Sequence, residues 1–416
     1  MKSWLPPLKR IVADFSFLPR LCRLTPRTPI LPSKVATAAV PSEEVSGGGA
    51  EEDLFYSASI GEVLGSRYVV KRKLGWGIYS NVWMVEDMEK PNTYFALKAL
   101  TTLGTVSPDI HELEYLECIR DADPSHRGYR HVPHMFDHFM LKCALGHPHR
   151  CFVTGLMAES TVSFAARSRN NRLRLKLTKQ ITKEIIFALD YLHNVCNIIH
   201  TDIKPSNILV ACTDMEELIN QLEPVKYLSG SDGIQVPQSQ PLNMSCLPEL
   251  QEEGIHAKLT DVGVACWADK VDQHFTEVIQ SPALRAPEVC IGAGWGKPAD
   301  IWSLGCTVYE LVLSDSLFPR EASDRAIPIL QTLVFGDFPS HMLERGKYTL
   351  EHYNPNGRLK IDPESRGSLE LSIEDPGSLP DVDVFIDFLK QMLRLDPEQR
   401  ASLDELLQHE WLKEVM

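Results

Sequence analysis

A change in hydrophobic periodicity near residue 158 is the feature that most constrains the fold. From Tyr68 to Lys98, short runs rich in Val, Tyr, Phe and Trp are separated by Gly or Pro-Asn, which is typical of antiparallel strands. Later in the chain, apolar residues recur at three- and four-residue spacing, which predicts helices at 176–193, 299–313, 384–395 and 403–410. We therefore predict an α+β, two-lobed architecture: a small antiparallel sheet with one main helix over residues 58–157, and a larger, mainly helical lobe over residues 158–416.

Two stretches do not follow this pattern. Residues 1–42 hold seven Lys and Arg against one acid and many prolines, which leaves the rest of the chain with a net charge of −20. We interpret residues 1–57 as a disordered basic arm and linker. A mitochondrial transit peptide has a similar composition, but the prolines would break its amphipathic helix. Residues 211–256 carry eight acids and one lysine, which predicts an acidic surface insertion.

Composition also narrows the class of protein. No run of 18 apolar residues is present, which disfavours a membrane span. Ten cysteines show no Cys-x-x-Cys pair, so reduced thiols are expected rather than disulfides or a zinc site. The acidic body disfavours nucleic-acid binding and favours a cationic partner, although acidity alone also suits any soluble protein.

A glycine pair stands between two of the predicted strands. Gly75, Trp76 and Gly77 are followed by Ser80 and Val82, and glycine has no Cβ to keep backbone N–H groups away from phosphate oxygens. The pattern predicts a loop over the phosphates of a nucleotide. A tight hairpin turn explains the same glycines equally well.

A lysine and a glutamate are predicted to act on the same phosphates. Lys98 ends the next strand run and reaches the α- and β-phosphates if a carboxylate holds it. We choose Glu112 as that carboxylate; Glu114 is the alternative, although it points about 200° away around a helix. The alternative for either glutamate is that it simply lies on the solvent-exposed face of a helix and has no role in binding. The predicted nucleotide-binding set is Leu74, Gly75, Trp76, Gly77, Ser80, Val82, Ala96, Lys98 and Glu112.

The stretch from His200 to Leu209, His-Thr-Asp-Ile-Lys-Pro-Ser-Asn-Ile-Leu, is the strongest signal in the chain. Phosphoryl transfer needs a carboxylate to take the hydroxyl proton, a cation beside the transferring group and ligands for magnesium. Asp202, Lys204 and Asn207 are predicted in these roles, in that order. Asp261, which precedes Val-Gly, is predicted as a second Mg²⁺ ligand. ATP and Mg²⁺ are therefore the expected cofactors.

Further motifs follow Asp261 along the chain. They are Ala286-Pro287-Glu288, the run from Asp300 to Gly305, and Arg400. A buried ion pair between Glu288 and Arg400 is predicted, with a structural rather than a catalytic role.

These motifs together resemble the eukaryotic protein kinase superfamily, and most of all the SR-protein kinases (SRPK family), particularly the shorter fungal-type members. The similarity covers residues 60–416. The specific matches are Gly61-Glu62 ahead of Arg67-Tyr68, the loop from Lys73 to Gly77 with Val82-Trp83, His200 to Pro205, Ala265-Cys266-Trp267, Ala283 to Glu288, and Pro298 to Ser303.

The resemblance implies a monomeric serine/threonine kinase of cytoplasm and nucleus that acts on arginine/serine-rich proteins of mRNA splicing, without direct nucleic-acid or membrane partners. Thr201 stands where many kinases have an arginine that anchors an activation-loop phosphate, so activity without that phosphate is expected. Ser206, Val262 and the hinge 154–157 depart from the SRPK pattern and leave the acids that would read arginine unassigned.

Two other functions compete with this interpretation. A pseudokinase scaffold binds partners without turnover, but it usually lacks the lysine or one of the aspartates, and Lys98, Asp202 and Asp261 are all present. A small-molecule kinase is disfavoured because Ala286-Pro287-Glu288 and the run 300–305 are expected to shape a peptide-binding platform. A transit peptide at residues 1–42 would instead direct the protein to mitochondria.

Overall fold

The computed structural model describes residues 55–168, 171–229, 235–244, 254–361, 366–373 and 376–413. The predicted basic arm lies outside the described residues up to residue 54. Contacts group the described chain into two units. The sheet unit comprises residues 55–167 and 209–264, and the helical unit comprises residues 168–208 and 265–413.

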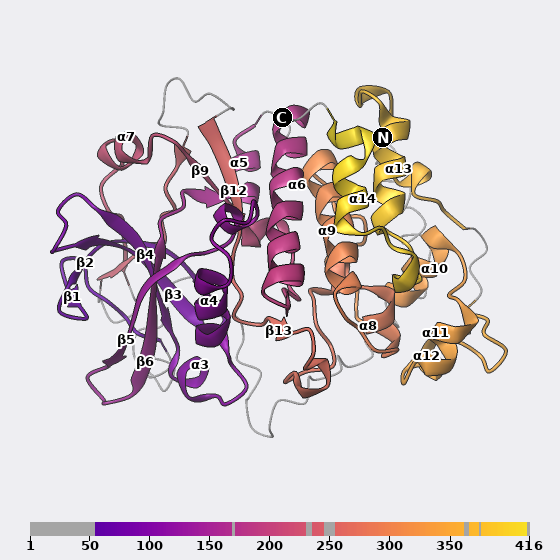
Figure 1. Ribbon diagram of the computed structural model, residues 1–416, viewed down its shortest axis with the longest axis horizontal. Coiled ribbons are helices and arrows are strands. Elements are labelled where there is room, and N and C mark those ends of the chain that lie inside the picture. Colours follow the sequence, from indigo (N-terminus) through magenta and orange to yellow (C-terminus); the bar gives the residue numbers. More distant parts are fainter. Residues whose placement is uncertain are drawn as a thin grey trace. The chain divides into compact units, whose positions relative to one another are not determined.

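A six-stranded antiparallel sheet is the centre of the sheet unit (Figure 1). Its strand order is β1-β2-β3-β4-β6-β5. The strands are β1 (Val63–Leu64), β2 (Tyr68–Gly77), β3 (Ser80–Asp87), β4 (Tyr94–Leu100), β5 (Met135–Lys142) and β6 (Pro148–Gly155). Alternate residues such as Tyr68 and Val70 on β2 are buried, because side chains along a strand point to opposite faces. They pack with Val85, Leu97 and Val153 in one apolar core.

Shorter elements complete the sheet unit. A small sheet has the order β12-β9-β7, and β10 pairs with β11. The elements are α3 (Thr102–Val106), α4 (Glu112–Asp121), β7 (Glu159–Ser160), α5 (Thr161–Ala166), β9 (Ile208–Cys212), α7 (Met215–Asn220), β10 (Tyr227–Ser229), β11 (Gln235–Pro237) and β12 (Ile255–Leu259).

The predicted surface insertion is not entirely on the surface. Leu242 and Met244 are fully buried, and the backbone N–H of Leu242 donates to the carbonyl of Ala158. The N–H of Gln240 donates to the carbonyl of Lys73 on β2. Leu218 and Ile255 are buried as well, so a few apolar side chains among many polar ones anchor the segment, a signal that overall composition hides.

The helical unit is built around α9 (Pro298–Leu313), which packs against α6 (Leu175–Asp190) and α13 (Val382–Met392) (Figure 1). A π-helical turn, Tyr191–Val195, continues α6. The other helices are α8 (Pro287–Ile291), α10 (Ile327–Phe335), α11 (Ser340–Arg345), α12 (Thr349–His352) and α14 (Leu403–Gln408). Two short strands, β8 (Ile198–Ile199) and β13 (Cys266–Trp267), form an antiparallel pair.

Local chemistry explains where the main helices begin and how they pack. Proline opens α9, at a position where its missing N–H costs nothing. Trp302 of α9 is fully buried and contacts the rings of Phe318 and Phe335. Ser402 and Glu405 cap the start of α14 reciprocally. A helix buried on nearly every side, as α9 is, must lie at the centre of its unit.

The α+β prediction, a small antiparallel sheet followed by a larger helical part, is confirmed. The predicted helices at 176–193, 299–313, 384–395 and 403–410 correspond to α6, α9, α13 and α14. The main helix expected near residues 110–120 is α4. The lobe boundary at residue 158 stays a prediction. The sheet unit takes in residues 209–264 as well as residues 55–167.

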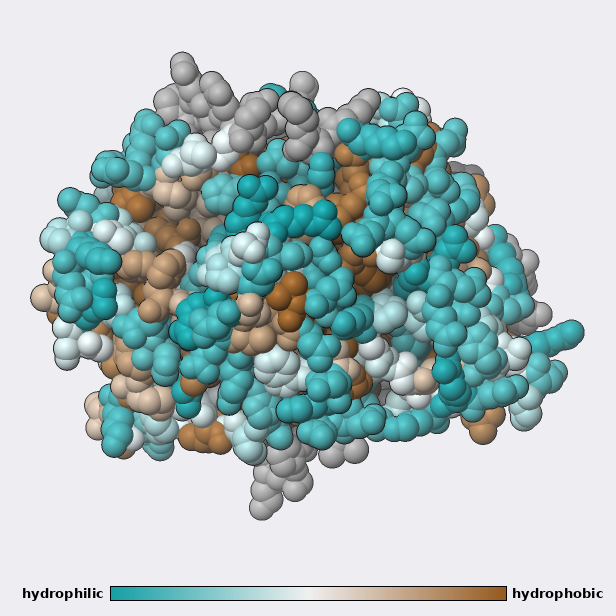
Figure 2. Space-filling view, viewed as in Figure 1, coloured by the Kyte–Doolittle hydropathy of each residue, from teal (hydrophilic) through white to brown (hydrophobic). Residues whose placement is uncertain are grey.

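Three further observations concern the surface, the cysteines and the length of the helices. Hydrophilic side chains cover most of the face seen in Figure 2. The eight cysteines within the described ranges are free thiols. Within those same ranges, every helix is too short or too polar to cross a lipid bilayer.

Candidate active site

The predicted phosphate loop is the turn between β2 and β3. Gly77 pairs with Ser80, so Ile78 and Tyr79 form a two-residue hairpin loop. A Cβ placed on Gly75 would meet no atom within 4 Å. The protein's own packing therefore does not require glycine at position 75, and the space beside its backbone is open to a ligand.

Lys98 lies at the centre of a charged cluster in the sheet unit. Its Nζ is 2.6 Å from Oε1 of Glu112 on α4 and 2.8 Å from Oδ1 of Asp261. Burial disfavours the charge on Lys98, but attraction to Asp261 and Glu112 outweighs it and raises the pKa of the lysine. Of the two glutamates considered, Glu112 is buried against Lys98, whereas Glu114 is exposed beside His111.

Gly263 allows this cluster to form. A Cβ at that position would lie 3.1 Å from Oε2 of Glu112 and 3.4 Å from Oδ1 of Asp261. Asp261 itself has a positive φ of 66°, which non-glycine residues rarely adopt. The backbone after β12 is thus bent so that the aspartate faces Lys98, and a side chain at residue 263 would crowd both carboxylates.

The predicted catalytic loop, residues 200–207, follows β8 in the helical unit and contains Asp202. Nζ of Lys204 lies 2.6 Å from Oδ2 of Asp202, and Nδ2 of Asn207 donates to the same oxygen at 3.1 Å and to the Asp202 carbonyl at 2.9 Å. The other carboxylate oxygen, Oδ1, is 3.4 Å from Oγ of Ser281. The side chain of Asp202 is 16% exposed, so its carboxylate is not completely closed off from solvent.

Asp300 fixes the backbone of this loop. Its carboxylate accepts hydrogen bonds from the N–H of His200 at 2.7 Å, the N–H of Thr201 at 2.9 Å and Nε2 of His193 at 2.8 Å. Thr201 has a φ of 68°, a strained value for a β-branched residue. Sequence reasoning named Asp300 only as part of a motif and missed this role. The signal was an acid in the first turn of a largely apolar helical run, 299–313, whose other acid, Glu310, lies near its end.

The structure thus forms two groups of predicted residues. Lys98, Glu112 and Asp261 are together in the sheet unit, near the open backbone of the glycine loop. Asp202, Lys204 and Asn207 are together in the helical unit. The remaining predicted nucleotide contacts, Leu74, Trp76, Ser80, Val82 and Ala96, are on β2, β3 and β4.

The donor set suits a hard divalent cation held largely by phosphate. Asn207 uses its amide nitrogen for Asp202, so its amide oxygen is the atom that suits a cation. Asp261 offers a carboxylate that is half exposed. No cluster of three His, Cys, Asp or Glu side chains able to hold a metal occurs in the described part of the chain. Magnesium takes one or two protein oxygens together with phosphates and water, and each unit offers one such oxygen, that of Asn207 in the helical unit and that of Asp261 in the sheet unit.

The predicted ion pair between Glu288 and Arg400 is present in the helical unit. The two side chains form a bidentate pair at 2.7 and 2.6 Å, and both are almost fully buried. The guanidinium also lies over the ring of Trp302. Such a pair fixes geometry, since removing either partner would leave a buried charge.

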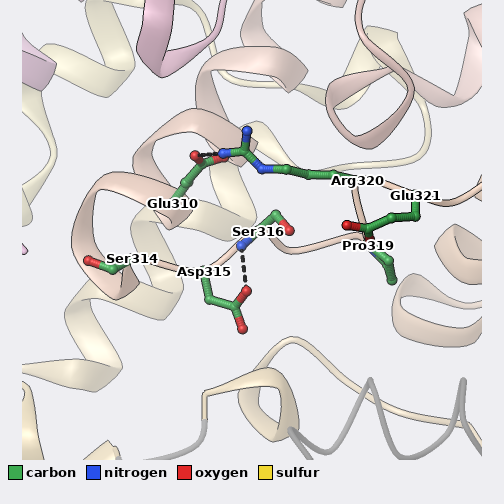
Figure 3. A pocket seen from close by; sticks show the side chains of 7 residues that line it. All are labelled: Glu310, Ser314, Asp315, Ser316, Pro319, Arg320 and Glu321. Atoms are coloured by element: carbon green, nitrogen blue, oxygen red, sulfur yellow. Dashed lines mark hydrogen bonds and ion pairs between the residues drawn. The ribbon is translucent and has the colours of Figure 1, made fainter. Parts of the chain in front are cut away.

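A polar cavity of about 210 Å³ opens at the end of α9. Carboxylates of Glu310, Asp315 and Glu321 line it, and Arg320 pairs with Glu310 (Figure 3). Burial is the main reason that the pKa of Glu310 is raised. Three acids against one cation make the cavity an acidic site.

Comparison with known proteins places these features in a family. Residues 68–412 match the family model of the protein kinase domain. The chain is 26% identical to SRSF protein kinase 3 of Mus musculus, an alignment that covers 94% of each protein. It is 28% identical to serine/threonine-protein kinase SRPK of Physarum polycephalum, over 87% of this chain and 89% of the relative.

Two further similarities agree with these. Protein kinase dsk1 of Schizosaccharomyces pombe is 27% identical over 92% of this chain and 86% of its own length. Among solved structures, the kinase domain of PF14_0431 superimposes with a TM-score of 0.66 and 24% identity, covering 87% of this chain and all of that one. The structural likeness supports the fold.

Proposed function

The chain belongs to the protein kinase family, and we propose that it is an SRPK-type serine/threonine kinase that phosphorylates arginine/serine-rich proteins of mRNA splicing. The observation that carries the proposal is the set of contacts around Asp202. One carboxylate oxygen is held by Lys204 and Asn207, and the other faces Ser281. This is the arrangement that a base for a substrate hydroxyl requires.

In the proposed reaction the hydroxyl oxygen of the substrate serine attacks the γ-phosphorus of ATP, and Asp202 accepts the proton of that hydroxyl. The bond from that phosphorus to the β–γ bridging oxygen breaks, and ADP leaves. Lys204, already within 2.6 Å of Asp202, offsets the charge of the transferring group. Lys98, kept protonated by Glu112 and Asp261, binds the α- and β-phosphates.

Asn207 and Asp261 are the residues that would hold Mg²⁺. The ion neutralises charge on the phosphates when it is bound. The open backbone beside Gly75 would receive the phosphate oxygens.

Charge supports an arginine-rich substrate. The chain has a formal net charge of −14. The cavity at the end of α9 offers three carboxylates, and a substrate guanidinium could replace Arg320 beside Glu310 (Figure 3). Guanidinium groups pair well with carboxylates because their planar donors match two oxygens at once. The acidic surface would also speed the approach of a basic protein at low salt.

Activation without phosphorylation is part of the proposal. Thr201, at the position of an arginine in many kinases, is buried. Between residues 265 and 288 the fixed cations are Lys270 and Arg285, and Arg285 already binds Asp324 and two backbone carbonyls. A phosphate on this segment would meet acids such as Asp269 and Asp272 more than cations.

A pseudokinase scaffold is the second candidate, and the intact contacts of Lys98 and Asp202 disfavour it. An assay of magnesium-dependent ATP consumption separates the kinase from the scaffold. It uses an Arg/Ser-repeat peptide and, as a control, a basic protein without such repeats. A kinase transfers ³²P to the repeat peptide. Nucleotide binding without transfer to any peptide would favour the scaffold.

A further inference from the structure

Two basic side chains of the sheet unit lie near each other without an acidic partner. Lys258 on β12 is half-buried, and its Nζ donates to the Val132 carbonyl at 3.1 Å. Arg130 is exposed, and its Nε donates to Nε2 of His131 at 2.9 Å. Within the described part of the chain, neither side chain forms an ion pair. An ammonium group taken partly out of water is costly to keep charged unless an anion compensates it.

The two cations come from segments that pack together. Arg130 and His131 belong to a short 3₁₀ turn, and Nδ1 of His131 donates to the Ala257 carbonyl on β12 at 2.9 Å. Burial lowers the pKa of His256, and the nearby charges of Lys258 and Arg130 lower it further. Two fixed cations and two histidines are thus gathered at one place in a chain whose net charge is −14.

The ring of His131 holds the guanidinium of Arg130. Its Nδ1 donates to a carbonyl, so its Nε2 is the acceptor for Nε of the arginine, which requires a neutral ring. Burial lowers the pKa of His131 to about 4, and the charges of Arg130 and Lys258 also lower it, so the ring is neutral at pH 7. The two terminal nitrogens of the guanidinium bind no acceptor among the described residues.

We propose that Arg130 and Lys258, with His256 beside them, bind a single phosphate group. A guanidinium fork and an ammonium are the groups that proteins use for phosphate oxygens. His131 fixes the arginine and the Val132 carbonyl fixes the lysine before a ligand arrives, which lowers the cost of binding. The acidic chain would repel a polyanion such as nucleic acid, so one phosphate, free or on a protein side chain, is the ligand that fits.

The charge of Lys258 sets how this site depends on pH. Burial lowers the pKa of Lys258 to about 8, so the lysine is charged below that value and neutral above it. Around it, Arg130 stays charged, and the lowered pKa values of His131, His134 and His256 keep these rings neutral near pH 7. A phosphate on serine is a dianion above its pKa of about 6. Affinity should therefore be highest between these two pKa values and fall as the pH rises above 8.

A titration with the nucleotide site blocked tests the inference. The chain, saturated with Mg²⁺ and a non-hydrolysable ATP analogue, is titrated in a calorimeter at constant chloride. The ligands are inorganic phosphate, a glycine-based phosphoserine peptide and the same peptide with unmodified serine. We expect saturable binding of both phosphate ligands and none of the serine peptide. Equal affinities identify free phosphate as the natural source, and tighter binding of the peptide identifies a phosphorylated protein.

Variants locate the phosphate. Lys258→Met and Arg130→Gln should each weaken its binding by at least about tenfold, because each removes charge-assisted hydrogen bonds. Lys142→Met removes an exposed lysine from β5 and is the matched control, with wild-type affinity expected. Unchanged affinity in either of the first two variants, or no saturable binding by wild type, overturns the inference. If Lys258→Met does not fold, the exposed position of Arg130→Gln still decides the question.

The pH profile separates a lysine that binds phosphate from one that only supports the fold. We expect wild-type affinity to fall by at least about tenfold between pH 7.5 and pH 9.5 as Lys258 loses its proton. Lys258→Arg should still bind phosphate and should lose this fall, because arginine stays charged throughout. The same fall in both proteins contradicts the assignment. Every measurement is of binding, so the result is independent of the proposed kinase activity.

Discussion

The catalytic loop and the activation segment belong to one unit but are held in different ways. The loop, residues 200–207, relies on one fully buried carboxylate, Asp300, which accepts three hydrogen bonds. The activation segment, residues 265–288, relies on separate contacts along its length. Glu277 contacts Lys347 and Tyr348, the Glu277 carbonyl accepts from Nε1 of Trp295, and Arg285 binds Asp324.

This difference in how the two regions are held determines how much stability is lost when a single side chain is replaced. Removal of Asp300 would take the carboxylate acceptor away from two buried backbone N–H groups, and such a loss costs about 1–3 kcal/mol for each group. The pair of Glu277 and Lys347 is about 60% exposed on both sides, and exposed pairs contribute about 0–1 kcal/mol. A loop whose backbone depends strongly on one carboxylate should lose more from a single replacement than a segment that is held by several separate contacts.

Replacement of Asp300 should have the largest effect. We expect Asp300→Ala to lower the free energy of unfolding by about 3–5 kcal/mol and to abolish phosphate transfer, because it breaks a buried charged network. Urea denaturation and peptide kinetics measure the two effects. Asp383→Ala, an exposed acid on α13, is the control and should change neither. An Asp300→Ala protein of wild-type stability would show that the loop has other supports.

Replacement of the proposed base should cost activity rather than stability. Asp202→Ala should lower kcat by about a thousandfold, which corresponds to ~4 kcal/mol. It should melt closer to wild type than Asp300→Ala, because the Asp202 side chain is 16% exposed whereas Asp300 is fully buried. Asp261→Ala should also abolish turnover and should weaken ATP binding more, since Asp261 contacts Lys98. Fluorescent-nucleotide titration compares the two affinities. Undiminished turnover in either variant would remove that residue from the mechanism.

More of the functional residues could be predicted from the sequence in the loop 200–207 than contacts in the activation segment 265–288, for a physical reason. Asp202, Lys204 and Asn207 lie within six residues, so local spacing alone brings them together. Lys98 contacts Glu112 and not Glu114, because residues two apart on a helix point about 200° away from each other and only one of the two can face the lysine. Contacts such as Asp300 to His200, or Gln280 to Ser303, depend on chain packing across many residues and on a positive φ. No spacing pattern encodes either.

Loss of a single activation-segment contact should have the smallest effect. The hydrogen bond from Lys347 lowers the pKa of Glu277, so this contact contributes above the ordinary glutamate pKa of ~4.3 and is lost as pH falls below it. We expect Glu277→Gln to cost under about 1 kcal/mol at pH 7, in low salt only. Denaturation of wild type, Glu277→Gln, Lys347→Met and the double variant gives the coupling energy. A loss of kinase activity in Glu277→Gln would make this contact a main support of the segment.

Phosphate transfer by the dephosphorylated protein tests the central claim most directly. Wild type and Asp202→Ala are treated with phosphatase, freed of it, and given Mg²⁺, γ-³²P-ATP and either an Arg/Ser-repeat, a Lys/Ser or an acidic peptide at low and high salt. The account predicts transfer by wild type only, a preference for the Arg/Ser repeat at low salt, and a smaller preference at high salt because exposed charges are screened. Activity that disappears with the phosphate, or an acidic peptide preferred at low salt, would contradict it.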